Sequence, residues 1–258
     1  MGFLEDIVET TSARIDKKKA KRPLDELMAQ LTPPGRGRPF SEALIAPGVS
    51  LIAEMKRASP SKGPIRPEAD VTEIVQMYER AGASACSILT EPTAFGGRLN
   101  DLREARAACS LPLLRKDFIV DEYQLVEAKL AGADAALLIV AALDDDRLRE
   151  LLAFGHQLGL DLLVEVHDEE DAEIAVAAGA EIVGINNRNL KTLEVDPETV
   201  LRLLPDIPAG TTVVAESGIS DPADVRRLEE AGVDAILVGE ALMSAADPAE
   251  AVRVLLGR

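Results

Sequence analysis

Residues 51–63 read LIAEMKRASPSKG, an apolar run that passes through charged residues into a Ser/Pro/Gly loop. Side chains two positions apart on a strand share a face, so Glu54 and Lys56 point the same way. Burying a charged pair at the end of a strand costs free energy, so such a pair indicates a function. The segment therefore predicts a strand that places functional groups at its end. Ser59 and Lys62 lie in the following loop, which we expect to be mobile and to close over an anionic ligand. An ordinary polar loop is the alternative.

Short apolar runs alternate with amphipathic helical stretches over the rest of the chain. This alternation predicts right-handed crossovers and a parallel sheet, and eight such units in about 200 residues predict a closed (β/α)8 TIM barrel of the α/β class. An open doubly wound sheet is the alternative, but no Gly-x-Gly-x-x-Gly follows the first strand, which disfavours dinucleotide binding. The predicted strands lie near 51–55, 85–89, 112–116, 135–139, 161–165, 182–186, 212–216 and 234–238. The predicted helices lie near 70–81, 99–108, 121–131, 144–159, 168–178, 196–204, 221–231 and 247–256.

The segment before the barrel has a different pattern. Apolar positions at helical spacing predict a helix over 3–30, residues 32–39 (TPPGRGRP) form a Pro/Gly break, and a short segment follows over 40–45. We expect one domain, in which residues 1–48 are a helical extension and residues 49–258 form the barrel. The N-terminus lacks the basic region and apolar run of a signal peptide.

Composition limits the classes of function. Hydrophobic residues make up 47% of the 258 residues and aromatic residues only 3%, so the core must be aliphatic. No apolar stretch is long enough to span a membrane. The net charge of −17 disfavours nucleic acid and membrane surfaces as partners. Cys86 and Cys109 are interpreted as buried, reduced thiols of a cytoplasmic protein, with a disulfide as the less favoured alternative. A monomer and a self-associated form both stay open.

Polar side chains stand where the predicted strands end, and TIM barrels carry their active sites at the carboxyl ends of the strands. Lysines and carboxylates that pack together shift each other's pKa values, which suits them to general acid–base catalysis. The predicted strand-end groups are Glu54, Lys56, Lys116, Glu165, Asn186, Arg188 and Glu216.

The ends of the last two strands carry a second signal. Ser217-Gly218 and Gly239-Glu240 lie where such barrels bind phosphate through backbone N–H groups, so Glu240 should turn its carboxylate outward. Tight turns are the alternative for these glycines.

Phenylalanine and histidine side chains are two further candidates for the site. Phe95 and Phe118 also follow strand ends, where an aromatic ligand could stack on them or where they simply pack in the core. His156 and His167 lack the spacing of a zinc site, and the lysines disfavour a magnesium site, so we expect no metal.

Six segments in order resemble the indole-3-glycerol phosphate synthase family. They are IAEMKRASPS (52–61), LLRKDF (113–118), LVEVH (163–167), GINNRNL (184–190), ESGI (216–219) and LVGEALM (237–243). The resemblance covers nearly the whole chain, the leading helical segment included. It implies closure of the indole ring of 1-(2-carboxyphenylamino)-1-deoxyribulose 5-phosphate, a phosphorylated small molecule, with loss of carbon dioxide and water and without a cofactor.

The same resemblance implies roles for the candidate residues. Lys116 would be the general acid that protonates the substrate carbonyl, and Glu165 would take or relay a proton. Glu54 and Lys56 would orient and polarise the substrate, with Lys56 contacting the substrate carboxylate or acting in dehydration. The other implied roles are positioning of the anthranilate part and hydroxyls by Asn186, Arg188 and Glu216, phosphate binding by Lys56, Ser217, Gly218, Gly239 and Glu240, ring contact by Phe95 and Phe118, and substrate contact by Ser59.

One position departs from the family pattern, and two other functions compete. Arg98 stands where the family more often has Ser, which puts any ligand role of that serine in doubt. Phosphoribosylanthranilate isomerase is the nearest enzyme alternative, but it would need an Asp/Cys pair at strand ends, and Cys86 falls in the middle of a strand. A catalytically silent barrel that binds a phosphate ligand or a protein would tolerate loss of Lys116.

Overall fold

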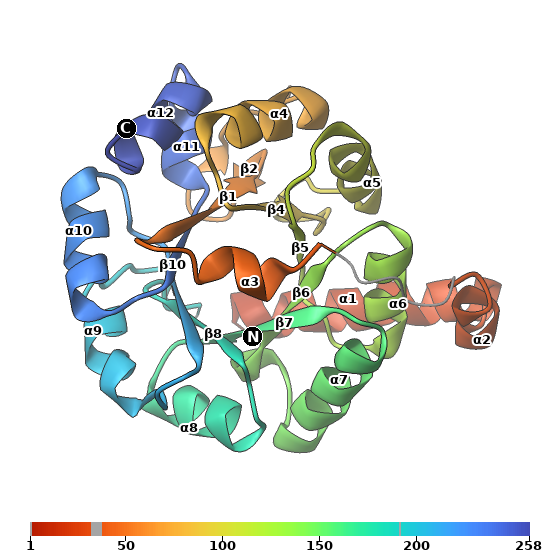
Figure 1. The fold of residues 1–258 in the computed structure, drawn as a ribbon. Helices are drawn as coiled ribbons and strands as arrows, with labels where there is room; N and C mark the ends of the chain where they lie inside the picture. The colour runs from red at the N-terminus through yellow and green to blue at the C-terminus, as the bar shows by residue number, and fades with distance from the viewer. Residues whose placement is uncertain (1, 32–37, 191) are drawn as a thin grey trace.

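The computed structural model describes residues 2–31, 38–190 and 192–258. Eight parallel strands form a closed barrel in the order β1-β10-β9-β8-β7-β6-β5-β4 (Figure 1). Because β1 pairs with both β4 and β10, the sheet has no free edge, which confirms the predicted TIM barrel and rules out the open sheet. The barrel strands are β1 (Ser50–Met55), β4 (Ala85–Leu89), β5 (Leu113–Lys116), β6 (Ala135–Ile139), β7 (Asp161–Val166), β8 (Ile182–Asn186), β9 (Thr212–Glu216) and β10 (Ala235–Val238).

The helices surround the barrel. They are α4 (Val71–Ala81), α5 (Leu99–Ala108), α6 (Glu122–Leu130), α7 (Asp145–Gln157), α8 (Glu169–Ala177), α9 (Thr199–Leu203), α10 (Pro222–Ala231) and α12 (Pro248–Leu255). All predicted helices are present, although α9 is shorter than expected. Five short elements were not predicted: the hairpin β2 (Ala58–Ser59) and β3 (Gly63–Pro64), η1 (Val140–Ala142), η2 (Leu204–Asp206) and α11 (Glu240–Ser244).

Aspartate starts many of these helices, which accounts for part of the acidic composition. Its carboxylate accepts N–H groups of the first turn that would otherwise lack partners, and its charge complements the helix dipole. The capping residues are Asp70, Asp121, Asp144, Asp168, Asp221 and Asp247.

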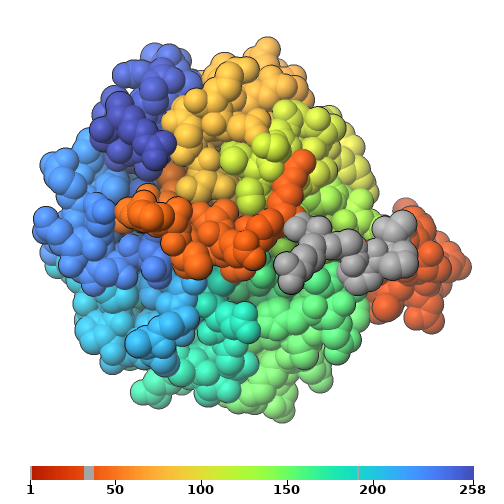
Figure 2. Space-filling model, viewed as in Figure 1, coloured from red at the N-terminus to blue at the C-terminus, as the bar shows by residue number. Residues whose placement is uncertain are grey.

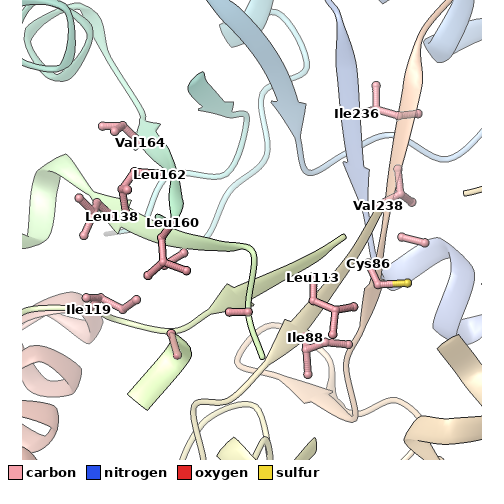
Figure 3. Packing of buried hydrophobic residues seen from close by; sticks show 14 of the residues in the cluster. Cys86, Ile88, Leu113, Ile119, Leu138, Leu160, Leu162, Val164, Ile236 and Val238 are labelled. Carbon is pink, nitrogen blue, oxygen red and sulfur yellow. The ribbon is translucent and has the colours of Figure 1, made fainter. Parts of the chain in front are cut away.

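Two apolar cores stabilise the fold, and both are mainly aliphatic, as composition required. The outer core lies between strands and helices, where Leu138, Leu162 and Val164 from β6 and β7 pack together (Figure 3). The inner core fills the barrel, with Leu114 and Leu163 fully buried. Because successive strand residues alternate between these cores, the residues two positions after Leu114 and Leu163 face into the barrel at its carboxyl end.

The helix α3 (Phe40–Leu44) closes the amino end of the barrel. Phe40 and Leu44 are fully buried in the inner core, and the backbone N–H of Ser41 donates to Asp161 at the start of β7. The segment around α3 lies over the middle of this face, with α1 on the far side (Figures 1 and 2). A ligand therefore has to enter the barrel from the carboxyl end of the strands.

The N-terminal extension is not one helix, so the prediction of a helix over 3–30 was wrong. The helix α1 (Phe3–Lys21) ends before Arg22, which is extended at φ −148°, and α2 (Leu24–Met28) begins after Pro23. Proline disfavours a helical conformation in the residue before it, which explains the break. The predicted Pro/Gly break at 32–39 lies outside the described residues except for its last two positions.

The extension is docked on the barrel by ion pairs. Lys18 lies 2.7 Å from Glu127 on α6, and Arg14 lies 3.6 Å from Glu91 after β4. Across residues 2–31, 38–190 and 192–258, no helix has the length and apolarity needed to cross a bilayer.

Candidate active site

A cavity of about 500 Å³ opens at the carboxyl ends of the strands. Every candidate residue from the sequence lies in its wall, although the residues are spread over seven of the eight strand–helix units. They are Glu54, Lys56, Ser59, Phe95, Lys116, Phe118, Glu165, Asn186, Arg188, Glu216, Ser217, Gly218, Gly239 and Glu240. The barrel thus brings together groups up to 186 positions apart (240 − 54) in one concave site, the usual place for a TIM-barrel active site.

Lys116 occupies the centre of the charged groups. Its Nζ donates to Oε2 of Glu165 at 2.8 Å and lies 3.2 Å from Oε2 of Glu216. Burial lowers the pKa of Lys116, but the negative charges of Glu165, Glu216 and Glu54 outweigh it and hold this pKa well above its ordinary value. Lys116 is therefore an ammonium at neutral pH, with a third N–H left to point at a ligand.

The two carboxylates beside Lys116 have opposite proton affinities. Burial raises the pKa of Glu165, but Lys116 and His167 outweigh burial and hold it well below its usual range. Burial, reinforced by the charge of Glu165, raises the pKa of Glu216 to about 8 despite Lys116. At neutral pH Glu165 is ionised while Glu216 is mostly protonated, so of the two only Glu165 is in the form that can accept a proton.

The Oε1 atoms of Glu165 and Glu216 also differ in their hydrogen-bond partners. Asn186 donates its Nδ2 to Oε1 of Glu165 at 3.1 Å, and the backbone N–H of Arg188 donates to the amide oxygen of Asn186. Glu165 is therefore held in one orientation, whereas Oε1 of Glu216 is a buried acceptor without a hydrogen-bond partner among the described residues.

Glycines make room for the carboxylates. A Cβ at Gly184 would collide with Oε1 of Glu216, and a Cβ at Gly239 would collide with Oε1 of Glu54. Glu54 in turn pairs with Lys56, whose Nζ lies 2.8 Å from Oε1, as their shared strand face predicted. The glycine at 184 thus serves the site although it did not belong to the predicted set.

We expect Gly184→Ala to lower kcat/KM on the order of 10²-fold, because the new Cβ displaces Glu216 by about 1 Å from its place beside Lys116. Steady-state kinetics with the substrate named above, together with circular dichroism to check the fold, measures this effect.

The matched control combines Gly184→Ala with Glu216→Ala. The second substitution removes the colliding carboxylate, so the thermal destabilisation caused by Gly184→Ala should shrink in this background. Equal destabilisation in both backgrounds, or wild-type kcat/KM in Gly184→Ala, would contradict this explanation.

The rim of the cavity is held by ion pairs between loops. Glu240 places one carboxylate oxygen 3.5 Å from Lys62 and the other 3.8 Å from Arg188. The expected outward carboxylate of Glu240 is therefore a bridge between two cations. The expected mobile loop carries the β2–β3 hairpin, in which Ser59 pairs with Gly63 and is buried.

Backbone geometry marks the end of β9. Ser217 and Gly218 have φ values of 63° and 74°, and Ser217 is one of two non-glycine residues at positive φ among the described residues. A left-handed serine is uncommon and is tolerated mainly where the backbone has a task. This conformation is compatible with backbone N–H groups that face an anion at the cavity wall.

Aromatic rings form one apolar side of the site. The ring of Phe118 lies 6.2 Å from that of Phe3 on α1 and 6.4 Å from that of Phe95. Glu91 holds the loop before Phe95, because its carboxylate accepts N–H groups of Thr93 and the two following residues. Phe3 was missed as a site residue, since its helical spacing indicated only packing.

Arg98, the departure from the family pattern, lies outside the cavity wall. Its guanidinium pairs with Asp101 at 3.0 Å on α5 and is largely exposed. Within the described part of the chain, no three His, Cys, Asp or Glu side chains come together as a metal site would require.

The family model described as indole-3-glycerol phosphate synthase matches residues 4–255. The chain is 50% identical to the indole-3-glycerol phosphate synthase of Nocardioides sp. (100% of this chain, 99% of the relative) and 45% identical to indole-3-glycerol phosphate synthase 2 of Streptomyces coelicolor (99% of each).

Among solved structures, 3-hexulose-6-phosphate synthase from Salmonella typhimurium superposes with a TM-score of 0.65. It is 15% identical, over 81% of this chain and 99% of that one. That likeness concerns the fold alone.

Proposed function

Since this chain belongs to the indole-3-glycerol phosphate synthase family, and so is a carboxy-lyase of tryptophan biosynthesis, we propose roles for the side chains of its cavity. The phosphorylated substrate, 1-(2-carboxyphenylamino)-1-deoxyribulose 5-phosphate, closes to an indole with loss of carbon dioxide and water. The observation that carries the proposal is the placement of Lys116 between an ionised and a protonated carboxyl group.

Lys116 acts as the general acid of ring closure. As the aromatic carbon attacks the carbonyl carbon, negative charge develops on the carbonyl oxygen, and a buried ammonium stabilises that charge where it forms. The ammonium then donates a proton to this oxygen. The nearby carboxylates keep Lys116 protonated until it transfers its proton to the substrate oxygen.

Glu165 acts as the base. Loss of carbon dioxide restores the aromatic six-membered ring. A proton then leaves the substrate carbon next to the nitrogen and passes to the departing hydroxyl group, so that water is lost and the five-membered ring becomes aromatic. Glu165 is ionised and fixed by Asn186 and Lys116, so it is ready to accept that proton. Glu216, which also lines the cavity, positions the substrate hydroxyls.

The remaining groups bind the two anionic ends of the substrate. Lys56, oriented by Glu54, faces the carboxylate, and Asn186 and Arg188 position the anthranilate part. The phosphate lies against the backbone at Ser217-Gly218 and Gly239-Glu240, with Lys56 and Ser59 nearby, while Phe95 and Phe118 contact the aromatic ring.

The direct test is an ultraviolet assay. Indole absorbance should rise when the enzyme receives the substrate named above, and should stay flat with phosphoribosylanthranilate. A rise with neither compound would contradict the assigned reaction at this site.

The isomerase alternative finds no support at the cavity. Cys86 packs in the outer core, and the described residues lining the cavity include no cysteine. An Asp/Cys acid–base pair therefore does not form at the strand ends, and ring closure is the better match to the lysine and carboxylates present.

We further propose one domain, with residues 1–48 as an extension of the barrel 49–258, because Phe3 contributes to the cavity wall. A cytoplasmic enzyme without nucleic-acid or membrane partners agrees with two free, buried cysteines and a net charge of −17.

A further inference from the structure

His167 stands beside the proposed base but belongs to none of the roles assigned so far. It follows β7 directly, two residues after Glu165 and on the same face. We propose that His167 is a positioning residue that, as an imidazolium anchored by Asp171, fixes the carboxylate of Glu165 for proton transfer. This inference depends on the proposed function of Glu165 as the base.

Two carboxylates hold the imidazole from opposite sides. Nε2 lies 3.1 Å from Oε1 of Glu165, and Nδ1 lies 3.2 Å from Oδ2 of Asp171 on α8. The backbone N–H of His167 donates to the same Asp171 oxygen at 2.9 Å. Only the doubly protonated ring carries a hydrogen on each nitrogen, so this arrangement favours the imidazolium.

The contact between His167 and Glu165 acts through charge. Nε2 is buried and has no aligned hydrogen-bond acceptor among the described residues, although Oε1 of Glu165 is within 3.1 Å. An ion pair tolerates such poor alignment, whereas a neutral hydrogen bond does not. The charge of the ring, more than its shape, is therefore what acts on Glu165.

Glu165 is thereby held at both oxygens. Oε2 accepts from Lys116, while Oε1 faces Asn186 and His167. Because the carboxylate of Glu165 is held at both oxygens, it cannot rotate toward Lys116 alone. His167 therefore keeps Oε1 oriented. In this arrangement Lys116 contacts the substrate, whereas His167 lies behind Glu165 and supports it.

The surroundings of the ring supply negative charge on both sides. Glu165 from β7 and Asp171 from α8 face it directly, and Lys116 from β5 and Glu216 from β9 lie beyond Glu165. The turn η1, packed against β7 and α8, carries no titratable side chain.

The effect on the ring follows from these charges. Burial lowers the pKa of His167, but Asp171 and Glu165 outweigh it and raise this pKa to about 9. The imidazolium is therefore the form present at neutral pH.

The chain offers a matched control, since its other histidine, His156, is exposed on α7 away from the cavity. We expect His167→Gln to lower kcat about tenfold with little change in KM, as loss of a supporting partner commonly does. His156→Gln should keep wild-type kcat. Asp171→Asn, which keeps the histidine but removes its anchor, should reproduce part of the loss if His167→Gln folds poorly.

A double-mutant cycle and NMR separate positioning from a structural role. In a Glu165→Gln background, His167→Gln should cause no further loss of kcat, because its target is already gone. In the His156→Gln protein, the single remaining imidazole should titrate near pH 9, and its midpoint should fall when Glu165 becomes Gln.

The outcomes are distinguishable. Additive losses of kcat, or an imidazole midpoint at or below about 6.5, the ordinary value, would overturn the role of His167 while leaving that of Glu165 intact. Unchanged kcat in Glu165→Gln alone would instead overturn the proposed function of the base.

Discussion

Lys116→Ala should lower kcat by at least about 10²-fold and by up to about 10⁴-fold, while the substrate still binds. The substitution removes the proton donor, and it also leaves two buried carboxyl groups without their cation. Since Lys116 lowers the pKa of both Glu165 and Glu216, both pKa values should rise in the variant. A higher pKa leaves a smaller ionised fraction of Glu165 to accept the substrate proton. Single-turnover kinetics and a separate measurement of substrate affinity test both parts.

Lys116→Arg is the informative comparison. A guanidinium keeps the positive charge between the carboxylates but does not give up its proton, so this variant should be nearly as impaired as Lys116→Ala. Lys129→Ala removes a lysine on α6 that donates to a backbone carbonyl away from the cavity, and its turnover should match the wild type. Wild-type turnover in Lys116→Ala would instead favour a silent binding barrel.

Much of the site was predictable because a barrel leaves few places for strand-end groups. Lys116 and Glu165 each follow an inward apolar residue by two positions, and closure of the sheet then brings them within 2.8 Å, although 49 residues separate them. Glycine also marks helix ends: Gly82 and Gly232 follow α4 and α10 with φ values of 96°, a left-handed conformation that favours glycine.

The missed features depend on contacts in space or on segments too short to show a period. The β2–β3 hairpin pairs only two residues per strand, which is too short to show an alternation of apolar and polar residues in the sequence. The bridge from Glu240 to Lys62 and Arg188 joins the start of α11 to two loops, whose approach no local pattern fixes. His167 had a usable signal, because it shares a strand face with Glu165. It was tested only against the spacing of metal ligands, which it does not match.

Glu165→Gln should lower kcat by about 10²- to 10⁴-fold and raise KM much less, because the amide keeps the shape of the carboxylate but cannot accept the proton. The pH profile should change too. Glu165 raises the pKa of Lys116, so its removal lowers that pKa. Lys116 must be protonated to donate, and the residual activity should therefore decline at a lower pH on the basic side than wild-type activity does.

Glu127→Gln provides the matched control for this prediction. Glu127 is also a buried carboxylate paired with a lysine, since Lys18 lies 2.7 Å from it, but it belongs to α6 and lies outside the cavity wall. Its loss should lower the thermal midpoint without changing kcat or the basic limb of the profile. If Glu165→Gln behaved in the same way, with kcat intact and only binding weakened, Glu165 would hold the substrate in place and another group would have to remove the proton.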